Sequence, residues 1–299
     1  MLRWLTTAAL LAAAGGAAKQ GELVIAPDGM RPSSIAGVPA RLRVDPAAPG
    51  MPVLNPALAA RAGLKPGPFA ASYAVGPVTI AGRTAVARID LGAGPIKRRV
   101  TWTARTYSDT ADAVVGPGGL PDPVIRFQLR APRPGERVVA LPIAKAGGLF
   151  GGWGLTFAAL TVDGEPMRVR FDPRRPTTAT AGAGVALARA QGGALEGSPT
   201  TTDIAWGVQR PVRTLRLERP LIVGPIRLDR LLVRVSDYGG TSSIADAAAP
   251  PPDPDEVVVT AKGKRDRSRD VLTIGRDQLD RCSSLTFDKR ARQVRLSCA

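Results

Sequence analysis

The sequence contains no histidine among its 299 residues, and this absence excludes several kinds of active site. A Ser-His-Asp or Cys-His nucleophile system cannot be built, and neither can a zinc site with histidine ligands. Hydrolysis would have to use carboxylates or a serine–lysine pair, and the Ser-x-x-Lys spacing of such pairs does not occur. No glycine-rich phosphate-binding motif leads from a strand into a helix, so no cofactor is expected.

Cysteine and aromatic residues are also scarce. The only cysteines, Cys282 and Cys298, flank a predicted hairpin, and we expect them to form a disulfide in an oxidising compartment rather than a metal site. Aromatic residues make up 4% of the chain, which leaves no stacking surface for nucleic-acid bases. The formal charge of +16 therefore indicates solvated strand faces, with an anionic-envelope surface as the alternative.

The first 18 residues have the layout of a secretory signal peptide. Arg3 precedes an apolar run from Trp4 to Ala14, and small residues follow as far as Ala18. A permanent membrane anchor needs roughly 20 apolar residues, so this run is short for one. Residues 1–18 therefore predict export to the periplasm or the medium, and a mature protein that is not an integral membrane protein.

The rest of the chain predicts a mostly β fold. It has 33 glycines and 28 prolines, few long helical periods and many short runs in which apolar and charged residues alternate. Two short helices are expected, at Ala57–Gly63 and Gly184–Gln191. The length fits one large or two small domains.

One stretch of the sequence occurs twice. Gly37–Pro49 and Gly164–Pro176 share their Gly, a Pro, two Arg, one Asp and the Pro on either side of the following dipeptide. In each copy a strand-like alternation runs into the acid, Asp45 or Asp172, which then meets a proline turn. The two passages indicate an internal duplication, with an acid at the end of a strand in each half.

The order of elements in the two halves resembles that of the aspartic peptidase family, of the retropepsin and pepsin kind. Each half has a strand, an Asp turn, a short helix, a long hairpin and an apolar-apolar-Gly segment. The resemblance implies two duplicated β lobes about a pseudo-two-fold axis. Their expected limits are 19–145 and 146–299, with a Pro-rich linker at 245–255 in the second lobe.

The resemblance also implies a site. Asp45 and Asp172 would face each other beneath a cleft for a peptide or protein substrate, and the hairpin Phe69–Leu91, with Tyr73, would cover it. Two carboxylates about 3 Å apart share one proton, and such a pair acts as general base toward water and general acid toward the substrate. The alternative is that each Asp only accepts backbone N–H bonds within its own proline turn.

Both copies depart from the family's Asp-Thr-Gly. Proline replaces the Thr in each, and the family's Gly is Ala47 in one copy and Arg174 in the other. Arg174 and Arg175 would place guanidinium groups beside the acids and favour ion pairs over a shared proton. Three hypotheses stay open: an aspartic endopeptidase, an inactive pseudoenzyme that binds peptides, and a structural partner in the cell envelope.

A separate segment of the sequence supports the hypothesis of a structural partner in the cell envelope. Glu256–Ala261 follows the Pro-rich linker and looks like the TonB box of outer-membrane receptors, whose extended strand pairs with the edge of a partner's sheet. The alternative is an ordinary strand of the second lobe.

Overall fold

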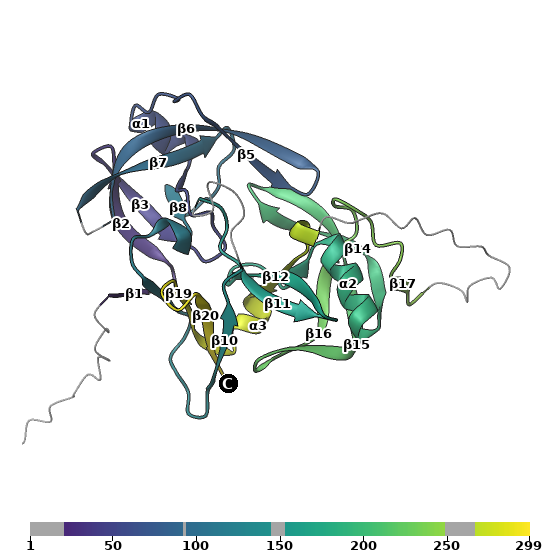
Figure 1. The fold of residues 1–299 in the computed structure, drawn as a ribbon. Helices are drawn as coiled ribbons and strands as arrows, with labels where there is room; N and C mark the ends of the chain where they lie inside the picture. The colour runs from purple at the N-terminus through teal and green to yellow at the C-terminus, as the bar shows by residue number, and fades with distance from the viewer. Residues whose placement is uncertain (1–20, 92–93, 145–152, 249–266) are drawn as a thin grey trace, which may run out of the picture.

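The computed structural model describes residues 21–91, 94–144, 153–248 and 267–299. The predicted signal peptide, residues 1–18, and the segment 256–261 lie outside these ranges. The described residues form a mostly β protein with three sheets and short helices, which confirms the predicted fold class (Figure 1).

The first sheet has seven strands in the order β2-β3-β8-β4-β7-β6-β5. It includes the predicted hairpin Phe69–Leu91 as β5 and β6, which pair antiparallel. The strands are β2 (Met30–Ile35), β3 (Val38–Val44), β4 (Val53–Leu54), β5 (Ala70–Val75), β6 (Val78–Asp90), β7 (Pro95–Thr103) and β8 (Ala113–Val115).

The second sheet has eight strands in the order β11-β12-β18-β13-β16-β15-β14-β17. The predicted linker 245–255 begins with β17, which pairs with β14, and its residues from 249 on lie outside the described ranges. The strands are β11 (Ala158–Val162), β12 (Glu165–Asp172), β13 (Thr178–Ala179), β14 (Gly193–Ala205), β15 (Val208–Val223), β16 (Ile226–Arg234), β17 (Ala245–Asp246) and β18 (Val271–Gly275).

The two sheets match strand by strand. The first seven strands of the second sheet repeat the order of the first, and every neighbouring pair has the same parallel or antiparallel sense in both. The repeated stretches supply β3 and β12, in which apolar residues point into the core and arginines point away. The duplicated β lobes predicted from the sequence are therefore present, and each Asp stands at the same place in its sheet.

A third sheet joins the ends of the chain to its middle. Its order is β1-β9-β19-β20-β10, with β1 (Glu22–Ile25), β9 (Val124–Gln128), β10 (Arg137–Pro142), β19 (Cys282–Asp288) and β20 (Gln293–Cys298). The C-terminal hairpin thus pairs with strands that precede residue 145, so this sheet draws on both predicted lobes. Cys282 and Cys298 are bonded across the hairpin, which confirms the predicted disulfide.

Helices are few and short. The helix α1 (Pro56–Arg61) follows β4 and α2 (Ala181–Gln191) follows β13, so they too are equivalent, and both overlap the predicted helices. Thr180 caps α2 by accepting a hydrogen bond from the Ala183 N–H. The remaining helices are α3 (Arg276–Leu279) and the 3₁₀ turns η1 (Pro117–Gly119) and η2 (Arg267–Arg269). Within the described ranges, no helix has the length and apolar character needed to cross a bilayer.

Candidate functional site

The two Asp loops follow equivalent strands, and each contacts the equivalent neighbouring strand of its sheet. Asp45 directly follows β3, and its N–H donates to the carbonyl of Val115 on β8 at 2.9 Å. Asp172 ends β12 and pairs with Gly275 on β18, the counterpart of β8. Because β3–β8 and β12–β18 are both parallel pairs, the strand ends bring each Asp loop to the same edge of its sheet.

A glycine at the end of the neighbouring strand makes room for each loop: Gly116 directly follows β8, and Gly275 is the last residue of β18. A Cβ added to Gly116 would lie 2.0 Å from the carbonyl oxygen of Ala48, and one added to Gly275 would lie 2.2 Å from the carbonyl carbon of Pro176. Backbone atoms cannot approach a methyl group so closely, so only glycine fits at either position. These are the glycines of the two apolar-apolar-Gly segments seen in the sequence.

Each acid also stabilises its own turn. The Asp45 Oδ1 accepts a hydrogen bond from the Ala47 N–H at 2.8 Å, and the Asp172 Oδ1 accepts one from the Arg174 N–H at 3.1 Å. This is the Asx turn that the sequence offered as the alternative to a facing pair. The second oxygen of each carboxylate takes no part in its turn and is available for other contacts.

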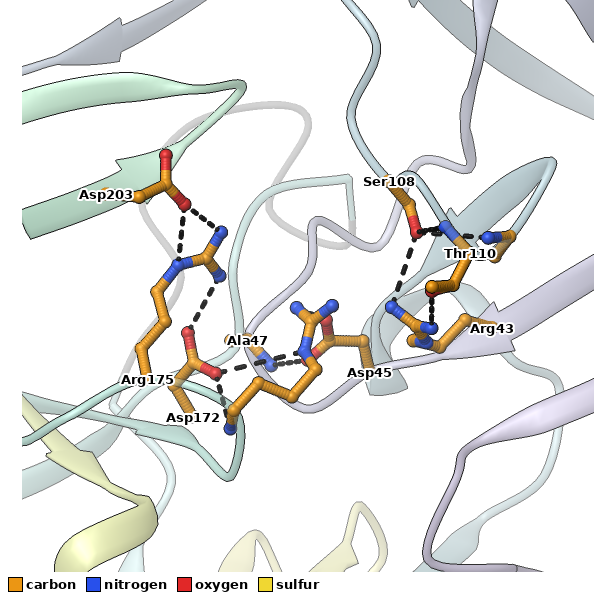
Figure 2. Close-up of polar contacts among 10 residues, drawn as sticks. Arg43, Asp45, Ala47, Ser108, Thr110, Asp172, Arg175 and Asp203 are labelled. Carbon is orange, nitrogen blue, oxygen red and sulfur yellow. Dashed lines mark hydrogen bonds and ion pairs between the residues drawn. The ribbon is translucent and has the colours of Figure 1, made fainter.

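The second oxygens meet arginines from the second lobe. The guanidinium of Arg174 contacts Asp45 Oδ2 across the lobe boundary, and its Nε lies 4.0 Å from Asp172 Oδ1. Arg175 extends the group, with Nη1 at 3.2 Å from Asp172 Oδ2 and Nη2 at 2.7 Å from Asp203 Oδ2. Figure 2 shows Asp172 and Asp203 on either side of Arg175. The guanidinium of Arg174 therefore contacts Asp45 and lies within ion-pair distance of Asp172.

The environments of the two acids move their pKa values in opposite directions. Burial raises the pKa of Asp45, and the negative charge of Asp172 adds to this rise, although Arg174 opposes it. Burial acts on Asp172 as well, but the charges of Arg170, Arg175 and Arg174 outweigh it and lower the pKa of Asp172. A proton-sharing pair needs direct contact between its oxygens, and here a cation lies against both carboxylates.

The main cavity does not reach either acid. This largely apolar cavity, called the main cavity because both lobes form its wall, has a volume of about 590 Å³, and Ala47 and Tyr73 line it, whereas Asp45 and Asp172 do not. Both acids are buried, with 1% and 0% of their surface exposed. The other residues predicted to bind substrate, Arg174 and Arg175, line a second cavity of about 630 Å³.

The wall of the main cavity is largely apolar and comes from both lobes. Every residue from Phe69 to Gly76 lines it, and this stretch contains the whole of β5. The second lobe contributes Ile204, Ala205 and Trp206 at the tip of the β14–β15 hairpin. A volume of this size lies within the usual range for ligand-binding clefts.

The two hairpins touch each other beside this cavity. The ring of Trp206 lies 4.6 Å from that of Tyr73 and 4.6 Å from that of Tyr107, measured between centroids. The role of Trp206 was not predicted from the sequence, because it depends on how two distant hairpins meet. Trp206 and Gly207 both have positive φ, at 52° and 67°, and connect paired strands as a two-residue hairpin turn.

No feature of the described residues suggests a metal centre. No group of three or more Cys, Asp or Glu side chains gathers within the ranges that the structure describes. The two cysteines are bonded to each other, and the buried acids are in contact with arginine.

No protein-family model matches the chain, and no curated protein matches it in sequence. Among solved structures, it is similar to the aspartic proteinase from Irpex lacteus. The two share 11% sequence identity with a TM-score of 0.43, over 91% of this chain and 94% of that one. A likeness of this size carries no information on chemistry.

Proposed function

We propose that this protein is an exported, aspartic-peptidase-like protein that binds an extended apolar peptide segment in its main cavity and does not cleave it. The proposal rests on one observation: the main cavity and the pair of acids are separate parts of the site. Ligand-sized, apolar space lies along β5, whereas Asp45 and Asp172 lie outside that space, in contact with Arg174.

Binding by strand addition follows from the position of β5. It is the last strand of the first sheet, so one of its edges has no partner in that sheet among the described residues. The backbone N–H and C=O groups of such an edge can pair with an extended peptide, while apolar side chains enter the pocket beside it. All six residues of β5 line the cavity, which puts that edge within reach of a bound chain.

Cleavage is not supported by the geometry. The reaction needs a water held between two carboxylates, one of which is protonated, with the scissile carbonyl directly above. The guanidinium of Arg174 contacts Asp45 and approaches Asp172. It therefore occupies the place beside the two carboxylates where that water would have to be held. Neither acid has a surface facing the cavity through which it could reach a substrate.

Export is part of the same proposal. The disulfide between Cys282 and Cys298 would persist in an oxidising compartment. The predicted signal peptide at 1–18 would deliver the chain to such a compartment. The periplasm or the medium would then also supply the peptides.

The test is to incubate the mature protein with eight-residue apolar peptides from pH 3 to 7. Tryptophan fluorescence reports binding, because Trp206 and Trp153 line the cavity, and mass spectrometry reports cleavage. We expect saturable binding of peptides that stay intact. Ala74→Arg should abolish binding by filling the edge of β5, since Ala74 is exposed and lines the cavity.

The matched control is Ala81→Arg. Ala81 is exposed on β6, the strand paired with β5, and it does not line the cavity, so the variant should bind peptides normally. Peptide cleavage that disappears in Asp45→Asn would overturn the proposal in favour of a peptidase. Failure of all peptides to bind, or equal loss of binding in both alanine variants, would also overturn it.

A further inference from the structure

The charged residues that line the main cavity are all positive. Four arginines line it, and no Asp or Glu is among its described lining residues. They are Arg99, Arg170, Arg234 and Arg269. A largely apolar cavity whose charged wall residues are all arginines is complementary to an apolar molecule that carries negative charge.

Two of the four arginines are engaged with aromatic rings. The guanidinium of Arg99 lies 4.8 Å from the centre of the Phe69 ring and donates to Thr84 Oγ1 at 3.1 Å. That of Arg269 lies 4.0 Å from the centre of the Tyr238 ring. Contacts of this kind hold a guanidinium in place.

Arg170 and Arg234 have donors that no protein group satisfies. Arg234 is 7% exposed, its Nη1 lies 3.2 Å from Asp237 Oδ2, and its Nε has no partner. The side chain of Arg170, on β12, forms no hydrogen bond or close ion pair with another described residue, and its Nε is buried without a partner, although its charge acts on Asp172 and lowers the pKa of that acid. Burial lowers the pKa of Arg234 to about 10, and the charges of Arg170 and Arg210 add to this although Asp237 opposes it. The charge of Arg170 therefore acts on Arg234, while Asp237 and Asp172 are the acids that act on the two arginines.

The first lobe has an arginine at the same position whose two terminal nitrogens have acceptors, although its Nε, like that of Arg170, is buried without a partner. Arg43 stands two residues before Asp45, as Arg170 stands two residues before Asp172. Arg43 donates to Ser108 Oγ at 3.3 Å and to Thr110 Oγ1, and it does not line the main cavity. Arg170 has no such acceptors and lines the cavity instead. The arginine at this position therefore donates to Ser108 and Thr110 in the first lobe, whereas it lines the main cavity in the second.

We propose that Arg170 and Arg234 form a carboxylate-binding subsite of the main cavity. The ligand is then an apolar chain with one carboxylate, either the free C-terminus of a peptide or an acidic side chain within it. This inference rests on the proposed function, because it assigns chemistry to the same cavity. Guanidinium groups bind carboxylates through paired, charge-assisted hydrogen bonds, which fixes the direction of the ligand as well as its charge.

The test compares peptides that differ only in charge. One apolar peptide is used with a free C-terminus and as its amide, and a second, amidated peptide carries a central Glu or Gln. Calorimetry gives the dissociation constants. We expect the carboxylate form of at least one pair to bind at least tenfold more tightly, and the pair that does so identifies the source of the carboxylate. A saturated fatty acid is the third arm, and its binding in preference to every peptide would overturn the peptide assignment.

The matched variants are Arg170→Met and Arg168→Met. Arg168 lies on the same strand, donates to the Ser268 carbonyl at 3.0 Å and is outside the cavity lining. Arg170→Met should reduce the tenfold preference to less than twofold, whereas Arg168→Met should retain it. Equal binding of charged and neutral peptides to the parent protein would overturn the subsite and leave the proposed function standing. Absence of binding by every ligand would overturn both.

Discussion

The two Asp loops have the same backbone and different side chains. In both, a strand ends at an acid, the acid accepts the N–H two residues on, and a glycine of the next strand gives the loop room. In the first loop the following positions are Ala47 and Ala48, and in the second they are Arg174 and Arg175. The comparison teaches that a duplicated scaffold keeps the positions of two acids while the second copy alone supplies the arginines that contact them.

The two glycines test whether the backbones are equivalent. Gly116→Ala and Gly275→Ala each place a methyl group within about 2 Å of a backbone atom of the adjacent loop, so the loop must shift. We expect each variant to lose about 3 to 5 kcal/mol of the free energy of unfolding, measured by urea denaturation. Gly239→Ala is the control, since no atom lies within 4 Å of its added Cβ. A loss in only one lobe would break the equivalence.

The two hairpins test how the lobes hold together. Trp206 is 7% exposed and packs against Tyr73 of the other lobe, so Trp206→Ala should cost about 3 kcal/mol in the same measurement. Trp153 also lines the cavity but is 40% exposed, and Trp153→Ala should cost less than about 1 kcal/mol. Equal costs for the two tryptophans would show that the hairpin contact does not stabilise the fold.

The two acids should differ in their cost of removal at pH 7. The lowered pKa of Asp172 means that its ionised form stabilises the fold above its unfolded pKa, near 4, and that this contribution is lost as pH falls through the folded pKa. The raised pKa of Asp45 has the opposite sign, so stability is lost as pH rises from about 4 through its folded pKa. Asp172→Asn should therefore cost about 2 kcal/mol and Asp45→Asn less than about 1 kcal/mol.

The pH dependence sharpens this test. The difference between Asp172→Asn and Asp45→Asn should shrink as the pH of the denaturation falls from about 4 through the lowered folded pKa of Asp172, because both parent carboxyls are protonated below it. A constant difference across the pH range, or a larger cost for Asp45→Asn at pH 7, would contradict the assigned charge states.

The smallest expected effect concerns the duplicated arginines. Arg43→Met loses hydrogen bonds to Ser108 and Thr110 and should cost about 1 kcal/mol. Arg170→Met loses no side-chain hydrogen bond to a described residue but removes a charge that lowers the pKa of Asp172, so it should cost less than Arg43→Met, about 0.5 kcal/mol. Thermal denaturation at one pH separates the two, and a larger loss for Arg170→Met would assign that arginine a structural role.

Much of the scaffold could be predicted from the sequence because its signals are local. The alternation in Gly37–Pro49 and Gly164–Pro176 encodes one strand and one turn in each copy, and the strand directions then place Asp45 and Asp172 at equivalent edges. The hairpin Phe69–Leu91 could be read from its alternating runs, but its turn, at Gly76 and Pro77 between β5 and β6, could not. The substitutions by Arg174 and Arg175 also indicated ion pairs with the acids, and both arginines form them.

The parts that could not be predicted depend on contacts between distant segments. Nothing local in Cys282–Asp288 indicates that it pairs with Val124–Gln128 to make a shared sheet. The contact of Trp206 with Tyr73 depends on how two hairpins from different lobes meet. The exclusion of both acids from the cavity is likewise a property of the assembled lobes, because it depends on which side of the loops the space lies.

The most direct test of the account is the affinity of Asp45→Asn for an apolar peptide, measured by calorimetry at pH 7. If the ligand contacts the cavity along β5 and not the acids, its dissociation constant should stay within twofold of the parent value. A loss of affinity of tenfold or more in a variant that remains folded would show that Asp45 touches the ligand, and would contradict the separation of cavity and acid pair.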